Sequence, residues 1–238
     1  MTHRPTLFLH VGAPKCASST LQAAFALFRD GAMTFPHELA DAISWQAGAH
    51  WVDKKPNDAD PVAAAAAWGE RDCILSHESF LNNFDKVFPP ICKLFPEHHV
   101  RVLIIERPID EMAQSAIAQY VRTCMKVPSA RTRLDAIRAM GMPAYTDALR
   151  LAHNQNCYEW SMAADSCCQG LLKDLEAHVV DWLGTPDIAE HISQIGTRNA
   201  RLSPATVDAM LERLDSFTGT PEEWRDMAEQ LERDHATP

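Results

Sequence analysis

Two groups of residues in this sequence combine a positive charge with hydroxyl side chains at spacings that suit anion binding. In the first group, Lys15 is followed by three hydroxyl residues, Ser18, Ser19 and Thr20. In the second group, Arg107 stands eight residues before Ser115. Ammonium groups, guanidinium forks and hydroxyls are donors that proteins use to bind phosphate and sulfate. Each group could therefore hold one anionic end of a ligand.

The residues around Lys15 predict a strand, a loop and a helix. Residues 7–11 form a short apolar run, and residues 12–14 (Gly-Ala-Pro) end it. From Ser18 onward, Leu21, Phe25 and Phe28 recur at helical steps. The first backbone N–H groups of a helix have no partner within the helix, so with the helix dipole they attract anions. The alternative is an ordinary strand-to-helix turn with a solvated lysine.

The residues around Arg107 predict a second strand followed by a helix. Residues 100–105 are rich in β-branched side chains, which is typical of a buried central strand. Pro108 suits the first turn of the helix that follows, and Asp110 suits its positive end. Arg107 at the strand exit and Ser115 about two turns into the helix could then contact one phosphate. The alternative is that Arg107 makes a structural salt bridge.

A candidate general base follows a third predicted strand, residues 72–76, in the pair His77 and Glu78. The carboxyl ends of parallel strands share one edge of a sheet, where ligands bind. We therefore expect His77 and Glu78 near the Lys15 loop, where either side chain could accept a proton from an attacking hydroxyl. Alternatively, one of them caps the next helix and the other is solvated.

Residues 14–21 resemble the 5′-phosphosulfate loop of sulfotransferases, P-K-[TS]-G-[TS]-[TS]-x-L, and residues 107–115 resemble the 3′-phosphate motif of the same family, with Ile109 at a variable position. Two departures occur in the loop, where Cys16 replaces a hydroxyl residue and Ala17 replaces glycine. A loop glycine usually provides a positive φ or room for a ligand. Neither motif is a Walker loop, because the lysine precedes the hydroxyl cluster instead of following a second glycine.

The resemblance implies an α/β fold with three layers, α/β/α, around a central, mainly parallel sheet, as in the P-loop NTPase-like sulfotransferases. It implies one domain, residues 1–238, with a helical C-terminal portion from about residue 203. The donor would be 3′-phosphoadenosine 5′-phosphosulfate (PAPS), the product adenosine 3′,5′-bisphosphate (PAP), and the acceptor a hydroxyl or amine of a small molecule or carbohydrate, with no metal expected.

The same resemblance assigns roles to residues. Lys15 would neutralise the bridging oxygen of the leaving phosphate, and His77 or Glu78 would be the base. Arg198 is the candidate replacement for a glycine-rich loop that other sulfotransferases supply to the 3′-phosphate. The phosphosulfate would bind to the loop residues Lys15, Cys16, Ala17, Ser18, Ser19 and Thr20. A P-loop kinase of a small molecule and a non-catalytic nucleotide- or partner-binding relative are the alternatives.

Composition limits the partners and the location of the protein. A formal net charge of −10 argues against a general nucleic-acid or anionic-membrane binder. We expect a cytoplasmic protein, because the sequence has no apolar run long enough to span a bilayer and its seven cysteines lack the spacing of a disulfide framework or a zinc site. Cys16 is either a small loop residue or a reactive thiol beside Lys15.

Further elements can be placed from periodicity and helix-capping signals. We expect a helix over residues 62–68, one or two helices around residues 141–143, and a strand over residues 157–162. Residues 171–183 predict an amphipathic helix closed by Gly184, with its apolar residues in the core. Ser203 and Pro204 predict the start of another helix. The apolar stripe that begins at Trp224 would dock on the domain or, in a homodimer, on a second subunit.

Overall fold

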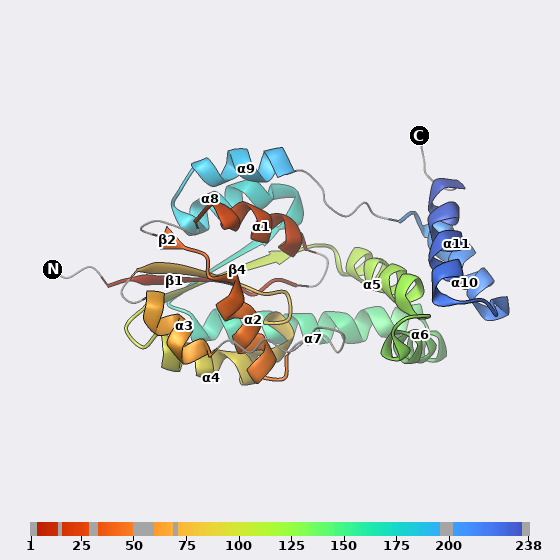
Figure 1. Ribbon diagram of the computed structural model, residues 1–238, viewed down its shortest axis with the longest axis horizontal. Coiled ribbons are helices and arrows are strands. Elements are labelled where there is room, and N and C mark those ends of the chain that lie inside the picture. The colour runs from red at the N-terminus through yellow and green to blue at the C-terminus, as the bar shows by residue number, and fades with distance from the viewer. Residues whose placement is uncertain are drawn as a thin grey trace. The chain divides into compact units, whose positions relative to one another are not determined.

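The computed structural model describes residues 4–13, 16–28, 33–49, 60–68, 71–195 and 202–234. Its centre is a five-stranded sheet with the order β2-β3-β1-β4-β5 (Figure 1). Every neighbouring pair of strands is parallel. The strands are β1 (Thr6–His10), β2 (Met33–Thr34), β3 (Asp72–Ser76), β4 (His99–Glu106) and β5 (Ser166–Leu171).

Helices cover both faces of the sheet, so the architecture is the predicted three-layer α/β/α fold (Figure 1). One face carries α1 (Ser18–Phe25), α8 (Leu175–Leu183) and α9 (Asp187–Ile195). Trp182 of α8 packs edge-on against Phe8 at 5.4 Å between ring centroids. The other face carries α2 (His37–Gln46), α3 (Pro61–Trp68), α4 (Phe84–Leu94) and the C-terminal part of α7 (Met142–Ala163). There, Trp160 packs edge-on against Phe84 and donates its indole N–H to the Leu81 carbonyl at 3.2 Å.

The chain divides into two compact units. The sheet unit comprises Met1–Arg107 and Ala152–Arg198, and the helical unit comprises Pro108–Leu151 and Asn199–Pro238. Helix α7 contributes residues to both units. The expectation of one domain over residues 1–238 stays a prediction.

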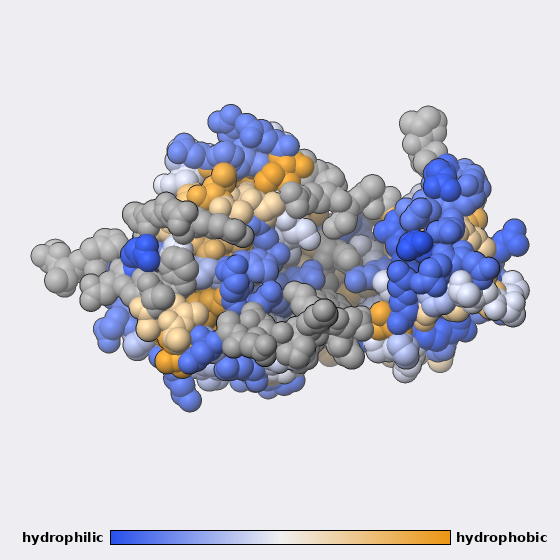
Figure 2. Space-filling model, in the orientation of Figure 1, coloured by the Kyte–Doolittle hydropathy of each residue, from blue (hydrophilic) through white to orange (hydrophobic). Residues whose placement is uncertain are grey.

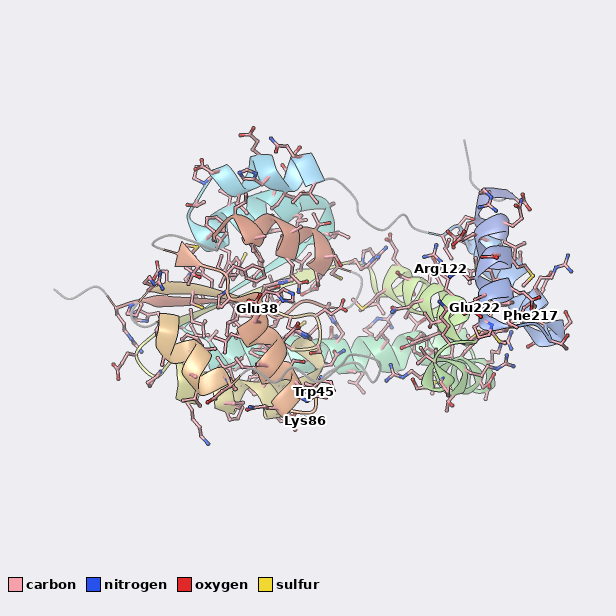
Figure 3. All side chains as sticks on the ribbon, in the orientation of Figure 1. Glu38, Trp45, Lys86, Arg122, Phe217 and Glu222 are labelled. Atoms are coloured by element: carbon pink, nitrogen blue, oxygen red, sulfur yellow. The ribbon has the colours of Figure 1, made fainter. Side chains whose placement is uncertain are left out.

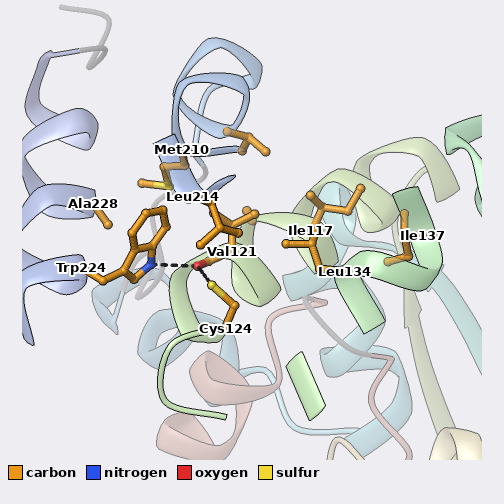
Figure 4. Close-up of a cluster of buried hydrophobic side chains, with 11 residues drawn as sticks. Ile117, Val121, Cys124, Leu134, Ile137, Met210, Leu214, Trp224 and Ala228 are labelled. Carbon is orange, nitrogen blue, oxygen red and sulfur yellow. Dashed lines mark hydrogen bonds between the residues drawn. The ribbon is translucent and has the colours of Figure 1, made fainter. Parts of the chain in front are cut away.

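The helical unit contains α5 (Ile109–Thr123), α6 (Pro128–Met140), the start of α7, α10 (Pro204–Ser216) and α11 (Pro221–Asp234). Figure 4 shows its core, in which Trp224 of α11 is 1% exposed and packs among apolar side chains of α5, α6 and α10. The Trp224 indole N–H and the Cys124 thiol both donate to the Val121 carbonyl, at 3.0 and 3.1 Å. The predicted stripe that begins at Trp224 therefore packs within its own unit.

Most predicted elements are confirmed. The strands expected over residues 7–11, 72–76 and 100–105 correspond to β1, β3 and β4. The helix expected over residues 62–68 is α3, and Gly141 separates α6 from α7. Helix α10 begins as predicted, because the Ser203 Oγ accepts a hydrogen bond from the Thr206 amide at 3.1 Å.

Two predictions near the end of the sheet unit are wrong. Residues 157–162 are not a strand but the last turns of α7, in which Cys157 and Trp160 lie one turn apart on a buried face. The helix predicted over residues 171–183 begins only at Leu175, after a 3₁₀ turn (Leu172–Asp174). Leu171 ends β5 and is 45% exposed, so it is not a core residue. Gly184 does end the helix, at φ 71°.

The visible surface is mostly hydrophilic over α9, α10 and α11 (Figure 2). This agrees with the acidic composition. None of the helices in the described ranges has both the length and the apolar character needed to cross a membrane.

Candidate functional site

The carboxyl ends of the three central strands lie side by side in the sheet unit. His10, the last residue of β1, pairs with Ser76 of β3 and Leu103 of β4. The pairing continues past β1, because the Val11 amide donates to the Leu103 carbonyl at 3.2 Å and the His77 amide donates to the His10 carbonyl at 3.3 Å. The loops that follow these strands therefore leave the sheet at one edge, as the sequence predicts, and this is the edge at which parallel sheets bind ligands.

Helix α1 starts at this edge without a side-chain cap. Ala17 occupies the N-cap position in the left-handed conformation, at φ 62° and ψ 17°. It is the one non-glycine residue with a positive φ in the part of the chain that the structure describes. The glycine of the sulfotransferase motif therefore stands where the backbone needs a positive φ, and Ala17 adopts that conformation at a cost.

Two buried polar atoms next to α1 have no hydrogen-bond partner among the described residues. These atoms are Ser18 Oγ and His10 Nε2. Both lie over Gly12, where a Cβ would meet Ser18 Oγ at 2.4 Å and His10 Nε2 at 3.2 Å. Buried polar groups normally find partners, so an orphaned hydroxyl at an uncapped helix start fits a place for an anion.

His10 is a residue that the sequence reasoning missed. Its Nδ1 hydrogen-bonds the Ser76 Oγ at 2.8 Å, and its side chain is fully buried. Burial lowers the His10 pKa to about 3, so the ring is neutral at physiological pH. A histidine that ends an otherwise apolar strand, one residue before the loop glycine, was the available signal.

Cys16 connects the loop to the second predicted group. The backbone amide of Arg107 hydrogen-bonds the Cys16 thiol, and the Arg107 charge also acts on it. Burial outweighs both effects and raises the Cys16 pKa to about 12. The interpretation of Cys16 as a reactive thiol is therefore wrong, because a buried thiol with a raised pKa is inert.

Other predicted anion-binding residues are only partly placed. Lys15 and Arg198 lie outside the described residues. Ser19 is exposed and Thr20 is buried, both in the first turn of α1. Ser115 lies on α5 in the helical unit, whereas Arg107 belongs to the sheet unit, so their joint contact with one phosphate stays a prediction.

His77 is buried and held at both ring nitrogens. Its Nδ1 accepts from the Ser79 backbone amide at 3.1 Å and lies 2.6 Å from the Ser79 Oγ. Because a backbone amide can only donate, the proton of the neutral ring is on Nε2, which faces Asp41 Oδ1 of α2 at 3.1 Å. Ser79 Oγ also contacts Ser44 Oγ of α2 at 2.9 Å. No motif in residues 37–46 indicates this contribution of α2.

Glu78 differs from its neighbour. Its side chain is half-buried and makes no hydrogen bond or ion pair with the described residues that the structure records. A base must have a free lone pair that can reach the substrate. His77 is thus held by Ser79 and Asp41, and which of His77 and Glu78 acts as the base stays a prediction.

The fold and this edge of the sheet define a parallel α/β protein with a candidate anion-binding loop after its first strand. A sulfotransferase of known crystal structure from Alicyclobacillus acidocaldarius has a similar fold, with a TM-score of 0.50 and 19% sequence identity over 94% of this chain and 100% of that chain. At this identity the similarity shows the fold alone. No protein-family model matches the sequence, and no curated protein matches it.

Proposed function

We propose that the protein is a sulfotransferase that transfers a sulfuryl group from PAPS to a hydroxyl or amine. The observation that carries the proposal is the buried, orphaned Ser18 Oγ at the uncapped start of α1, in a fold that resembles a sulfotransferase. When bound, PAPS would supply an activated sulfuryl group and a phosphate at each end of the ribose. The amide hydrogen and the hydroxyl of Ser18 are donors that fit the 5′-phosphate, which carries the sulfuryl group.

The loop residues would hold the phosphosulfate, and Lys15 would stabilise the charge that develops on the oxygen of the leaving 5′-phosphate. Arg107 and Ser115 would hold the 3′-phosphate, with Arg198 as a further cation. The Arg107 amide contact with Cys16 supports this scheme, because it brings the strand exit of β4 next to the loop.

Glu78 would take the proton of the acceptor. His77 would orient the residues after β3, since its two nitrogens are held by Ser79 and Asp41. We propose a small-molecule or carbohydrate acceptor and a cytoplasmic location.

Calorimetric titration with PAP tests the proposal. We expect binding in the micromolar range without magnesium, and a loss of at least about tenfold in affinity for Lys15→Ala, because one charge-assisted contact contributes about 1.5–3 kcal/mol. The matched control is Lys86→Ala, an exposed lysine of α4 (Figure 3), which should bind PAP like the unmodified protein.

Three results would contradict the proposal. No PAP binding at high micromolar concentration would exclude the donor, and magnesium-dependent ATP binding would favour a small-molecule kinase. A protein that binds PAP but transfers no sulfuryl group to a panel of hydroxyl and amine acceptors would be a non-catalytic relative. For an active enzyme, Glu78→Gln should lower turnover and leave PAP affinity unchanged.

A further inference from the structure

Three potential metal ligands converge beside the carboxyl end of β4. They are the carboxylate of Glu106 and, from α7, the imidazole of His153 and the thiol of Cys157. Their ligand atoms all lie within 4.8 Å of one another. His153 and Cys157 are buried and Glu106 is half-buried, so the cluster is enclosed on the α7 side and reachable from the Glu106 side. All three residues belong to the sheet unit.

The distances are close to those of a tetrahedral zinc site. In such a site, with Zn–S near 2.3 Å and Zn–N or Zn–O near 2.0–2.2 Å, neighbouring sulfur and nitrogen ligands lie about 3.6 Å apart and nitrogen and oxygen ligands about 3.4 Å apart. Here Cys157 Sγ lies 3.5 Å from His153 Nε2, and Glu106 Oε2 lies 3.9 Å from the same nitrogen. The third pair, Cys157 Sγ and the Glu106 carboxylate, lies within 4.8 Å, so the half-buried Glu106 side chain would have to move inward to close the site.

The arrangement does not fit a Cys-His-Glu catalytic triad. In a triad the nucleophile and the carboxylate face different nitrogens of the imidazole, so that one nitrogen takes the proton while the other is held. In this cluster the thiol and the carboxylate both lie near Nε2 of His153. Convergence of all three ligands on one point is the geometry of chelation.

The elements that carry the ligands are rigid, which favours binding. His153 and Cys157 are four residues apart on α7, so they project from the same side of the helix. Glu106 is held by the last residue pair of the sheet, opposite Leu171. A thiolate and a carboxylate together would offset the double charge of a divalent cation, which avoids an uncompensated charge in a largely buried place.

We propose that Glu106, His153 and Cys157 form a binding site for a thiophilic divalent cation, with Zn²⁺ as the best match. A mixed sulfur, nitrogen and oxygen set suits zinc, whereas magnesium and calcium prefer oxygen ligands alone. Three protein ligands leave the fourth position to water. The site would tie β4 to α7. It lies close to the anion-binding loop, because Glu106 and Cys157 both interact electrostatically with Cys16, but zinc binding is measured without the proposed transferase activity.

Metal content and cobalt spectroscopy test the site. The full-length protein, loaded with Zn²⁺ and dialysed, should retain one equivalent of zinc by plasma mass spectrometry. Co²⁺ should replace it and give a sulfur-to-cobalt charge-transfer absorption, which requires a thiolate ligand. Glu106→Gln, His153→Ala and Cys157→Ser should each weaken zinc binding by at least about tenfold, because even outer-shell changes cost 10–100-fold.

The matched control is Cys92→Ser, which removes an exposed thiol of α4 outside the cluster and should leave zinc binding unchanged. Zinc should raise the melting temperature of the unmodified protein and of Cys92→Ser, but not of Cys157→Ser. Glu106→Gln keeps the size of the side chain, so it separates lost ligation from lost folding if a buried variant is unstable. Less than stoichiometric zinc, or full zinc binding by folded Glu106→Gln and Cys157→Ser, would overturn the proposal.

Discussion

Because Ala17 has a left-handed backbone, replacing it by glycine should affect the free energy of unfolding differently from the same change in a right-handed helix. A left-handed conformation costs an L-residue about 1–2 kcal/mol, which Ala17→Gly would recover. Glycine in turn loses about 0.4–1 kcal/mol through the larger entropy of the unfolded chain. Loss of a half-buried methyl removes up to about 0.5 kcal/mol more. Together these effects should change the free energy of unfolding of Ala17→Gly by between about −0.5 and +1.6 kcal/mol, with a midpoint of about +0.5 kcal/mol.

The same substitution at Ala23 is the matched control. Ala23 is also half-buried and lies in the right-handed interior of α1, where glycine costs about 1 kcal/mol. The two variants should thus differ by about 0.5–2.6 kcal/mol, with Ala17→Gly the more stable. For a chain of this size, that difference corresponds to about 1–10 °C in melting temperature, measured by circular dichroism. Equal melting temperatures for the two variants would refute the left-handed assignment at Ala17.

Three further predictions follow from buried groups. Because the His10 pKa is lowered from 6.5 to about 3, the unfolded chain binds a proton below pH 6.5 that the folded chain does not. Stability should fall by about 2 kcal/mol from pH 7 to pH 5 through this residue, and urea unfolding of His10→Asn should lack that part of the loss. With its pKa near 12, Cys16 should be alkylated far more slowly at pH 8 than the exposed Cys92, as peptide mapping would reveal; equal rates would contradict its burial. Trp224→Phe removes the indole donor to the Val121 carbonyl and should destabilise the helical unit by about 2 kcal/mol in thermal unfolding; an unchanged transition would mean that this bond is not formed.

Much of the fold could be predicted from the sequence because its central strands carry a strong signal. Residues 100–105 are mostly β-branched, with Arg101 as the one charged side chain, and they lie in β4, which is paired on both sides. Strand β5 has no such run, since Ser166, Gln169 and Gly170 interrupt it, and its pairing with β4 decides its conformation. Residues 157–162 resemble a strand because a short segment fits either period, and the helical pattern of α7 shows only over its whole length.

The candidate site was predictable where a local motif specifies it. The position of Ala17 in the loop before α1, and that of Arg107 just after β4, follow from motifs made of residues close together in the sequence. The Asp41 contact with His77 joins segments far apart in sequence, and so does the meeting of Glu106 with α7. Such contacts depend on how the helices pack on the sheet, which residue spacing within one segment does not encode.

The order of the strands also affects how the protein is made. Strand β1 is the first to leave the ribosome, yet its two neighbours in the sheet begin at Asp72 and His99. The residues of β1 therefore cannot pair with both β3 and β4 until about the first 106 residues have been synthesised. Contacts of such long sequence separation slow folding, because closing the intervening chain costs entropy before any hydrogen bond forms. During translation, the apolar residues of β1 therefore stay without their partner strands until β3 and β4 have emerged.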